Sequence, residues 1–337
     1  MNDTNFFSSN TYLPLPTSSN PKVMLAIDSS LLSKNAFKLY NPFSKKAIYL
    51  KNFSSFLLSN FNFVFKNVLP IKTYQKGYFI KHLENKLALN LVSSVYYATA
   101  GDKVVLQLQT EQKIIGYIKY PINEIGIKRI ENEKKAIELF AKKGIVDSYI
   151  LYGHFNSTPY LYLKELKGTI EHVTHLQLVS LLENLKKKNK FLLKNHPRIL
   201  QLIMQLKQFN LFEELAIIKK ICETSTVKYS EVYEHGDFAP WNLITHNNKV
   251  TPFDFEYFEE TGLEFLDLIK YYYQIALLLK GTSEKEMFNF IYKKIKHDEI
   301  EILLQVFLIK EISKKKTKKE LFTFEKKILN IITDASC

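Results

Sequence analysis

The 337-residue sequence predicts an α+β fold with two lobes, a small antiparallel β lobe and then a larger, mainly helical lobe, preceded by an N-terminal extension. Three observations lead to this prediction. Short apolar runs alternate with polar residues and turn signals over 91–120, whereas apolar residues recur at helical spacing from 174 onward. Hydrophobic residues make up 46% of a chain with only ten Gly and ten Pro, so it can bury a large core.

The predicted elements of the first half follow from local patterns. Residues 1–85 form the extension, which the sequence leaves without a role and in which we expect a hairpin around an Asn-Pro turn at 41–46. The β-rich lobe then spans 86–165. We expect a meander of three strands, at 91–98, 103–109 and 113–120, followed by a helix over 127–143 that ends at Gly144. Two further strands are expected at 148–152 and 160–164.

The second half, 166–337, is expected to be the helical lobe. Its periodicity changes to helical spacing, interrupted by a stretch of loop and short strand over 226–262. The predicted helices lie at about 174–188, 198–223, 263–280, 284–297, 299–313 and 318–334.

Charge and cysteine content narrow the class of protein. The 47 Lys and Arg against 34 Asp and Glu give a formal net charge of +13, but only Arg129 and Arg198 are arginines. Proteins that read base edges and phosphates favour the arginine fork, so the composition argues against a nucleic-acid partner. The lysine runs at 186–190 and 314–319 are interpreted as solvated helix faces. Two distant cysteines, no visible secretory signal and no apolar run of about 18 residues predict a cytoplasmic protein without a membrane span.

One segment carries chemistry. It places a carboxylate at Asp237, a carboxamide five residues later at Asn242, and a second carboxylate twelve residues further at Asp254. A turn at 246–249 separates two short β-like stretches, so a hairpin can bring Asn242 and Asp254 to one end. Oxygen ligands of these types suit Mg²⁺, which leaves Asp237 free to accept the hydrogen of a hydroxyl group.

This segment resembles the aminoglycoside phosphotransferase and choline kinase superfamily, the small-molecule relatives of protein kinases. The hallmark H-G-D-x-x-x-x-N matches His235-Gly236-Asp237 and Asn242, and the metal motif matches Asp254-Phe255-Glu256. The resemblance covers roughly 86–335 and implies a protein-kinase-like two-lobed fold. It also implies that Asp237 acts on the acceptor hydroxyl and that Asn242, Asp254 and Glu256 serve the metal.

The resemblance further implies a nucleotide site in the β-rich lobe. Lys119, at the end of the third strand, would hold the ATP phosphates, and Glu133 on the next helix would orient it. Gly101 is the single glycine in the turn where the family places its phosphate loop. Backbone groups near Lys164 and Leu166 would bind the adenine. Asp267 matches an acidic residue of the family, and we expect a supporting role for it.

The implied activity is an ATP- and Mg²⁺-dependent phosphotransferase that phosphorylates a hydroxyl of a small molecule, such as a sugar, an aminoglycoside or an amino alcohol. Four glutamates either form an acidic acceptor pocket or belong to a solvated loop: Glu256, Glu259, Glu260 and Glu264. The weak glycine loop keeps a non-catalytic kinase-like binding module as the alternative, and the positive charge keeps a nucleic-acid-binding protein as a third reading. The sequence does not decide between ATP and GTP as the phosphate donor, and it does not give the oligomeric state.

Overall fold

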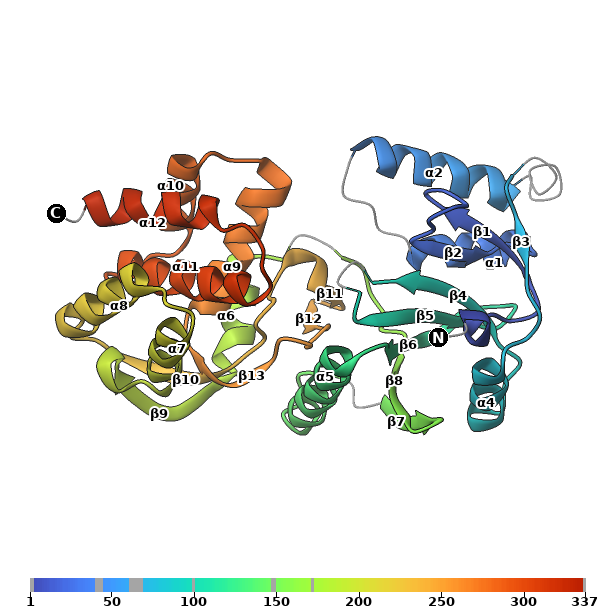
Figure 1. Cartoon of the computed structure of the whole chain (residues 1–337), viewed down its shortest axis with the longest axis horizontal. Coiled ribbons are helices and arrows are strands. Elements are labelled where there is room, and N and C mark those ends of the chain that lie inside the picture. The colour runs from blue at the N-terminus through green and yellow to red at the C-terminus, as the bar shows by residue number, and fades with distance from the viewer. Residues whose placement is uncertain are drawn as a thin grey trace. The chain divides into compact units, whose positions relative to one another are not determined.

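A computed structural model describes residues 3–39, 45–60, 69–98, 101–146, 150–170 and 173–335 (Figure 1). The chain divides into two compact units. Unit 1 holds 1–135 and 148–166, and unit 2 holds 136–147 and 167–337. Strands dominate unit 1 and helices dominate unit 2, which confirms the predicted α+β class with one β-rich and one helical lobe.

Unit 1 is built on an antiparallel sheet that has eight strands within the described ranges. In spatial order these are β3 (Lys72–Thr73), β1 (Thr11–Leu15), β2 (Val23–Ala26), β4 (Val92–Tyr97), β5 (Lys103–Gln109), β6 (Ile114–Pro121), β8 (Thr158–Lys164) and β7 (Ile150–Phe155). The meander β4-β5-β6 lies where alternation predicts it, because its apolar side chains Val95, Leu106 and Ile118 are fully buried on one face.

The N-terminal residues continue this sheet beyond β4. β2 pairs with β4 in antiparallel register, with Val23 opposite Tyr96 and Met24 opposite Val95. β1 pairs with β2, and β3 pairs with β1. The segment before residue 86 therefore shares one sheet with the meander that follows it.

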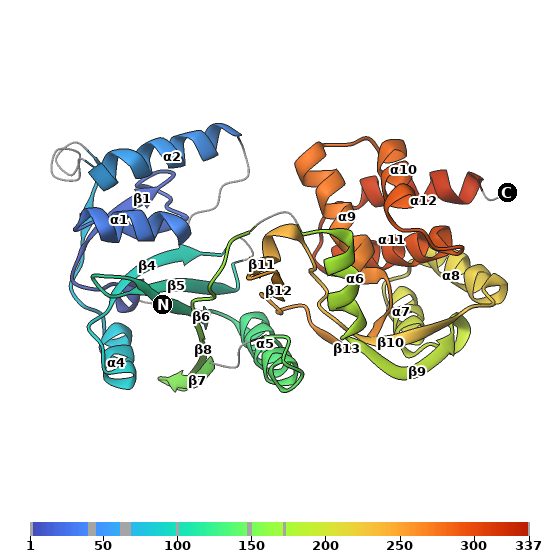
Figure 2. The same ribbon diagram turned by 180° about the vertical axis from the view of Figure 1, so that it is seen from behind.

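Helices cover both faces of the sheet in unit 1. They are η1 (Asp3–Phe6), α1 (Ser30–Ala36), η2 (Phe37–Leu39), α2 (Lys45–Asn60), α4 (Tyr78–Leu87) and α5 (Glu124–Lys142), of which residues 124–135 belong to unit 1. Figure 2 shows α1 and α2 on one face and α4 on the other; Phe37 and Leu58 are buried on the first face, and Phe79 on the second. The hairpin expected near 41–46 is wrong in its flanks, which are helical; residues 40–44 lie outside the described ranges.

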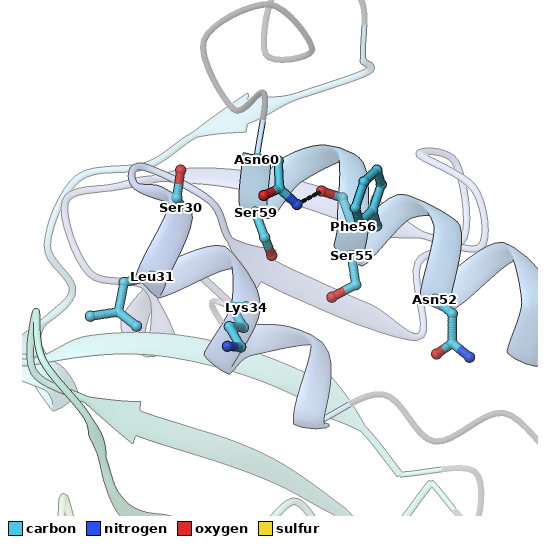
Figure 3. A pocket seen from close by; sticks show the side chains of 8 residues that line it. All are labelled: Ser30, Leu31, Lys34, Asn52, Ser55, Phe56, Ser59 and Asn60. Atoms are coloured by element: carbon cyan, nitrogen blue, oxygen red, sulfur yellow. Dashed lines mark hydrogen bonds between the residues drawn. The ribbon is translucent and has the colours of Figure 1, made fainter.

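A groove of about 560 Å³ with both polar and apolar lining runs between α1 and α2 (Figure 3). Its lining includes the serines Ser30, Ser55 and Ser59 together with Lys34 and Asn52. None of the predicted site residues lines it, so the groove is not part of the chemistry that the sequence predicts.

Unit 2 combines helices with two small sheets. The helices are α6 (His175–Glu183), η3 (Leu193–Asn195), α7 (Pro197–Gln208), α8 (Phe212–Thr224), η4 (Pro240–Asn242), α9 (Leu266–Gln274), the π-helix η5 (Ile275–Lys280), α10 (Glu284–Lys294), α11 (Ile300–Thr317) and α12 (Thr323–Ala335). The strands are β9 (Lys186–Leu192), β10 (Lys228–Glu234), β11 (Leu243–His246), β12 (Lys249–Pro252) and β13 (Glu259–Leu263). β10 lies between β13 and β9, and β11 pairs with β12.

Three helices of the structure differ in their limits from those that the sequence predicts. The lysine run at 186–190 belongs to strand β9, where Lys187 pairs across the sheet with Glu231 on β10 at 2.8 Å. The helix predicted over 198–223 is split into α7 and α8, because Asn210 adopts a left-handed φ of 56° between them. The helix predicted from 263 begins at Leu266, after β13. Of the helices in the described ranges, none combines the length and the apolar character that crossing a membrane requires.

Candidate active site

The predicted catalytic loop joins β10 to β11 in unit 2, and His235 fixes its shape. The Nε2 atom of His235 lies 2.9 Å from the carbonyl oxygen of Phe253, and Nδ1 accepts the backbone N–H of Asp237 at 3.3 Å. Both contacts are satisfied by one neutral tautomer that carries its proton on Nε2. Burial lowers the pKa of His235 and keeps the ring neutral.

Asp267 holds the start of the loop. Its carboxylate, in the first turn of α9, accepts the backbone N–H groups of His235 at 2.7 Å and Gly236 at 3.1 Å. Burial raises the pKa of Asp267 to about 7, although the two N–H groups act in the opposite direction. Asp267 therefore has the supporting role that the sequence predicts.

Gly236 is required where the loop turns. Its φ is +76°, and a Cβ atom there would lie 2.1 Å from the carbonyl oxygen of Tyr257. A side chain would meet rigid backbone as well as an unfavourable backbone conformation. The close approach also places Tyr257 directly beside the catalytic loop.

Asp237 and Asn242 contact one another. The Nδ2 group of Asn242 donates to the backbone carbonyl of Asp237 at 2.9 Å and to its Oδ2 atom at 3.2 Å. These bonds orient the amide so that its oxygen Oδ1 is left to serve as a ligand.

The hairpin β11-β12 brings the second carboxylate to the same place. Leu243 pairs with Pro252, and the N–H of Phe253 donates to the carbonyl of Asn242 at 3.0 Å, so Asn242 and Asp254 lie at one end of the hairpin. This arrangement confirms the predicted hairpin. Asp254 has a left-handed φ of 65°, a conformation that non-glycine residues keep only where the surroundings enforce it.

An aromatic cluster holds the backbone after Asp254. The ring of Phe255 lies between His235 and Phe140, with centroid distances of 4.7 Å and 5.0 Å. Glu256 follows in a turn and is partly buried.

The donor set fits Mg²⁺ shared with a phosphate substrate. Within the described ranges no group of three or more His, Cys, Asp or Glu side chains is arranged to hold a metal. Mg²⁺ does not need such a cage, since it usually binds one or two carboxylates together with substrate phosphates and water. One carboxylate from Asp254 and one amide oxygen from Asn242 match that requirement.

The predicted nucleotide residues of unit 1 include a buried ion pair. Lys119 on β6 and Glu133 on α5 are only 8% and 1% exposed, and Lys119 Nζ lies 2.7 Å and 2.6 Å from the two carboxylate oxygens. Glu131, the other glutamate in this stretch, is exposed. The structure thus brings together the two residues that the sequence selects.

Gly101 lies in the turn between β4 and β5 with a φ of +65°. Next to it, the buried Asp102 forms an ion pair with Arg129 on α5 at 2.5 Å, which ties this turn to the helix that carries Glu133. The sequence analysis did not predict this pair. The scarcity of arginine was a usable signal for it, since the other arginine, Arg198, is also buried in an ion pair, with Glu259.

Lys164 and Leu166 stand at the end of β8. Lys164 is exposed and lies opposite Gly116 in the β6-β8 register, so its backbone is held by the sheet. The N–H of Glu165 donates to the carbonyl of Ile115 at 3.2 Å. Leu166 has no backbone hydrogen bond to any residue in the described ranges, which leaves its N–H and carbonyl able to bind a ligand.

A group of buried charges around the catalytic loop was also missed by the sequence reasoning. Lys310 on α11 contacts the carboxylate of Glu234, the last residue before the loop, and Lys270 on α9 lies 2.7 Å from Glu311. The sequence did contain a signal for these buried charges, because Lys310 and Glu311 interrupt the apolar run of α11.

Comparison with known proteins gives similarity at the level of structure only. No family model and no curated protein matches the sequence. Solved structures similar to this chain include an ADP-bound aminoglycoside phosphotransferase (16% identity, 75% of this chain and 95% of that chain, TM-score 0.43). They also include an ethanolamine kinase from Plasmodium vivax (15% identity, 90% of this chain and 94% of that chain, TM-score 0.42). A third is a choline kinase from Streptococcus pneumoniae (14% identity, 77% of this chain and 100% of that chain, TM-score 0.37). Because the TM-scores lie below 0.5, we base the proposed function on the residues of this chain.

Proposed function

We propose that this chain is an ATP- and Mg²⁺-dependent phosphotransferase that phosphorylates a hydroxyl group of a small molecule. The observation that carries the proposal is the loop 235–242 with its hairpin, in which Asp237 is hydrogen-bonded to Asn242 and Asp254 lies at the same end of the hairpin as Asn242.

Each proposed role follows from the chemistry of the residue. Asp237 would orient the acceptor hydroxyl and accept its proton; His235 accepts the N–H of Asp237, and Asp267 holds the two residues before it. Lys119, oriented by Glu133, would bind ATP phosphates in unit 1. Asn242 and Asp254, with help from Glu256, would hold Mg²⁺, which when bound supplies positive charge to the phosphate oxygens. Most of the rate enhancement would come from positioning and charge neutralisation.

The decisive experiment measures ATP-dependent phosphorylation of a panel of hydroxyl compounds by the wild-type chain and by Asp237→Asn. We expect transfer to at least one compound by the wild type, with the rate reduced by about 10³-fold or more in the variant while Mg·ATP still binds. Undiminished transfer by Asp237→Asn would refute the assignment. If the folded wild-type chain binds no Mg·ATP, the non-catalytic binding module is favoured instead.

A further inference from the structure

Two of the four glutamates considered for an acidic acceptor pocket, Glu259 and Glu264, are paired with other groups of unit 2. Glu259 pairs with the buried Arg198, with 2.7 Å between Oε1 and Nη2. Glu264 accepts the N–H of Ser230 at 2.9 Å and lies 3.1 Å from Lys186. Their negative charges are compensated within the protein, so they are poorly suited to attract a polycationic acceptor.

A lysine on α11, distant from the catalytic loop in sequence, contacts that loop. Lys314 Nζ lies 3.4 Å from the carbonyl oxygen of Gly236, the residue before Asp237, and 3.7 Å from the ring centroid of Tyr257. Lys318, one turn later on α11 and its C-cap, lies 4.6 Å from the same ring and donates to the Tyr257 hydroxyl at 2.8 Å. Two positive charges therefore flank the tyrosine that packs against the loop.

Lys314 differs from its neighbours in how its charge is compensated. Lys270, Lys310 and Lys315 each contact a carboxylate, from Glu311, Glu234 and Glu325. Among the described residues Lys314 forms no ion pair within 4.0 Å: a carbonyl oxygen and an aromatic ring contact its ammonium group, and the carboxylates of Glu311 and Asp237 act on it from farther away. A half-buried ammonium with no carboxylate in direct contact is further stabilised by an anion that binds it directly.

The position of Asp237 indicates which ligand could bring an anion to Lys314. Burial lowers the pKa of Lys314 to about 8, although Glu311 and, more weakly, Asp237 raise it, so the group is charged at neutral pH and Asp237 lies near it. Any hydroxyl that Asp237 activates must come within hydrogen-bond distance of its carboxylate. The remainder of the acceptor then lies within a few ångströms of the loop, on which Lys314 and Tyr257 pack.

We propose that Lys314, with Lys318 and Tyr257, binds an anionic group, a phosphate or a carboxylate, on the acceptor. The substrate class is then a hydroxyl compound that already carries a negative charge, such as a sugar phosphate or a sugar acid, and not a polyamine. This inference rests on the proposed function, because Asp237 is taken as the group that receives the acceptor hydroxyl. The same ammonium could instead contact the phosphoryl group of ATP, and the test separates these sources.

The first test measures binding without turnover. Glucose 6-phosphate, gluconate and glucose are titrated calorimetrically at low salt onto the full chain in a Lys119→Met/Glu133→Leu background. This double change removes the proposed nucleotide-phosphate lysine without leaving the buried Glu133 as an unpaired charge. We expect the two anions to bind better than glucose. Lys314→Met should weaken anion binding about tenfold and Lys314→Arg should retain most of it. Lys316→Met, an exposed lysine on the same helix, is the matched control and should change nothing.

The second test measures kinetics with Mg·ATP and the same acceptors. We expect Lys314→Met to raise KM for anionic acceptors and to leave KM for ATP unchanged. A rise in KM for ATP alone would assign Lys314 to the transferred phosphoryl group and overturn the proposal. Equal binding of glucose and the anions, or equal loss in Lys316→Met, would also overturn it. If no acceptor is phosphorylated but the anions bind through Lys314, the anion site stands and the proposed phosphotransferase activity fails.

Discussion

Lys119 and Glu133, fourteen residues apart in sequence, form a buried ion pair in which one ammonium group contacts both oxygens of one carboxylate. Strand β6 supplies the lysine and helix α5 supplies the glutamate. Breaking such a pair leaves an isolated buried charge, which destabilises a protein more than removing both partners does. The pair can therefore be tested for stability and for function separately.

The first prediction compares Glu133→Leu with the double variant Lys119→Met/Glu133→Leu. The single variant should lower the free energy of unfolding by about 3 kcal/mol, because Lys119 stays behind without its carboxylate. The double variant should recover much of that loss and still fail to bind Mg·ATP. Urea denaturation and nucleotide titration measure the two effects. Normal ATP affinity in the double variant would remove Lys119 from the nucleotide site.

The second prediction uses two glycines of unit 2 that share a left-handed backbone, Gly236 with φ +76° and Gly281 with φ +61°. Alanine at Gly281 meets no atom within 4 Å and should cost about 1 kcal/mol of unfolding free energy. Alanine at Gly236 would meet the Tyr257 carbonyl, so it should cost about 2–4 kcal/mol and also disturb the position of Asp237. Equal losses for the two variants would show that the close contact carries no energy.

Much of the candidate site could be predicted because its signals are local. The residues His235-Gly236-Asp237 and Asn242 lie within eight positions, and the turn that closes the hairpin has Asn247 and Asn248, which both adopt positive φ. Alternating apolar residues predict β5 correctly, although both of its faces are buried: on the polar face Gln107 and Gln109 donate to carbonyl oxygens of α1. Such features depend on neighbours in sequence, which the sequence displays directly.

The remaining features depend on partners that are distant in sequence. The lysine run of β9 has no periodicity of its own, and its strand conformation comes from pairing with β10, about forty residues later. The join between β2 and β4 links positions some seventy residues apart. Lys314 meets Gly236 across 78 positions, so a run that looks like a solvated helix face contains a lysine that packs on the catalytic loop.

The third prediction concerns pH and Asp267. Burial raises its pKa from 3.8 to about 7, so the folded chain keeps a proton that the unfolded chain releases above about pH 4. Stability should therefore fall as pH rises from about 4 to 7 and then level off, with at most about 4 kcal/mol from this group. Asp267→Asn cannot ionise and should lack this component. The stability difference, wild type minus variant, must decrease with pH in urea titrations. An increase would mean that the two N–H donors lower the pKa instead.

The fourth prediction concerns pH and Lys314, and it depends on the anion site proposed above. Burial lowers the pKa of Lys314 from 10.5 to about 8. Charged groups face it from several elements: Lys310, Glu311 and Lys318 on or next to its own helix, Lys270 on α9, Glu259 on β13 and Asp237 in the loop. A lysine binds an anion only when protonated, so affinity for glucose 6-phosphate should be constant well below pH 8. Above pH 8 it should fall about tenfold per pH unit.

Arginine at position 314 provides the control, because a guanidinium group keeps its charge throughout this range. Binding by Lys314→Arg should stay nearly constant up to about pH 10, where the phosphate of glucose 6-phosphate is already fully ionised. Calorimetric titrations of both proteins between pH 6.5 and 10 compare the two profiles. If the wild type and Lys314→Arg lose affinity in parallel, another group controls anion binding and Lys314 does not contact the ligand. A loss confined to the wild type would identify the ammonium of Lys314 as the titrating group.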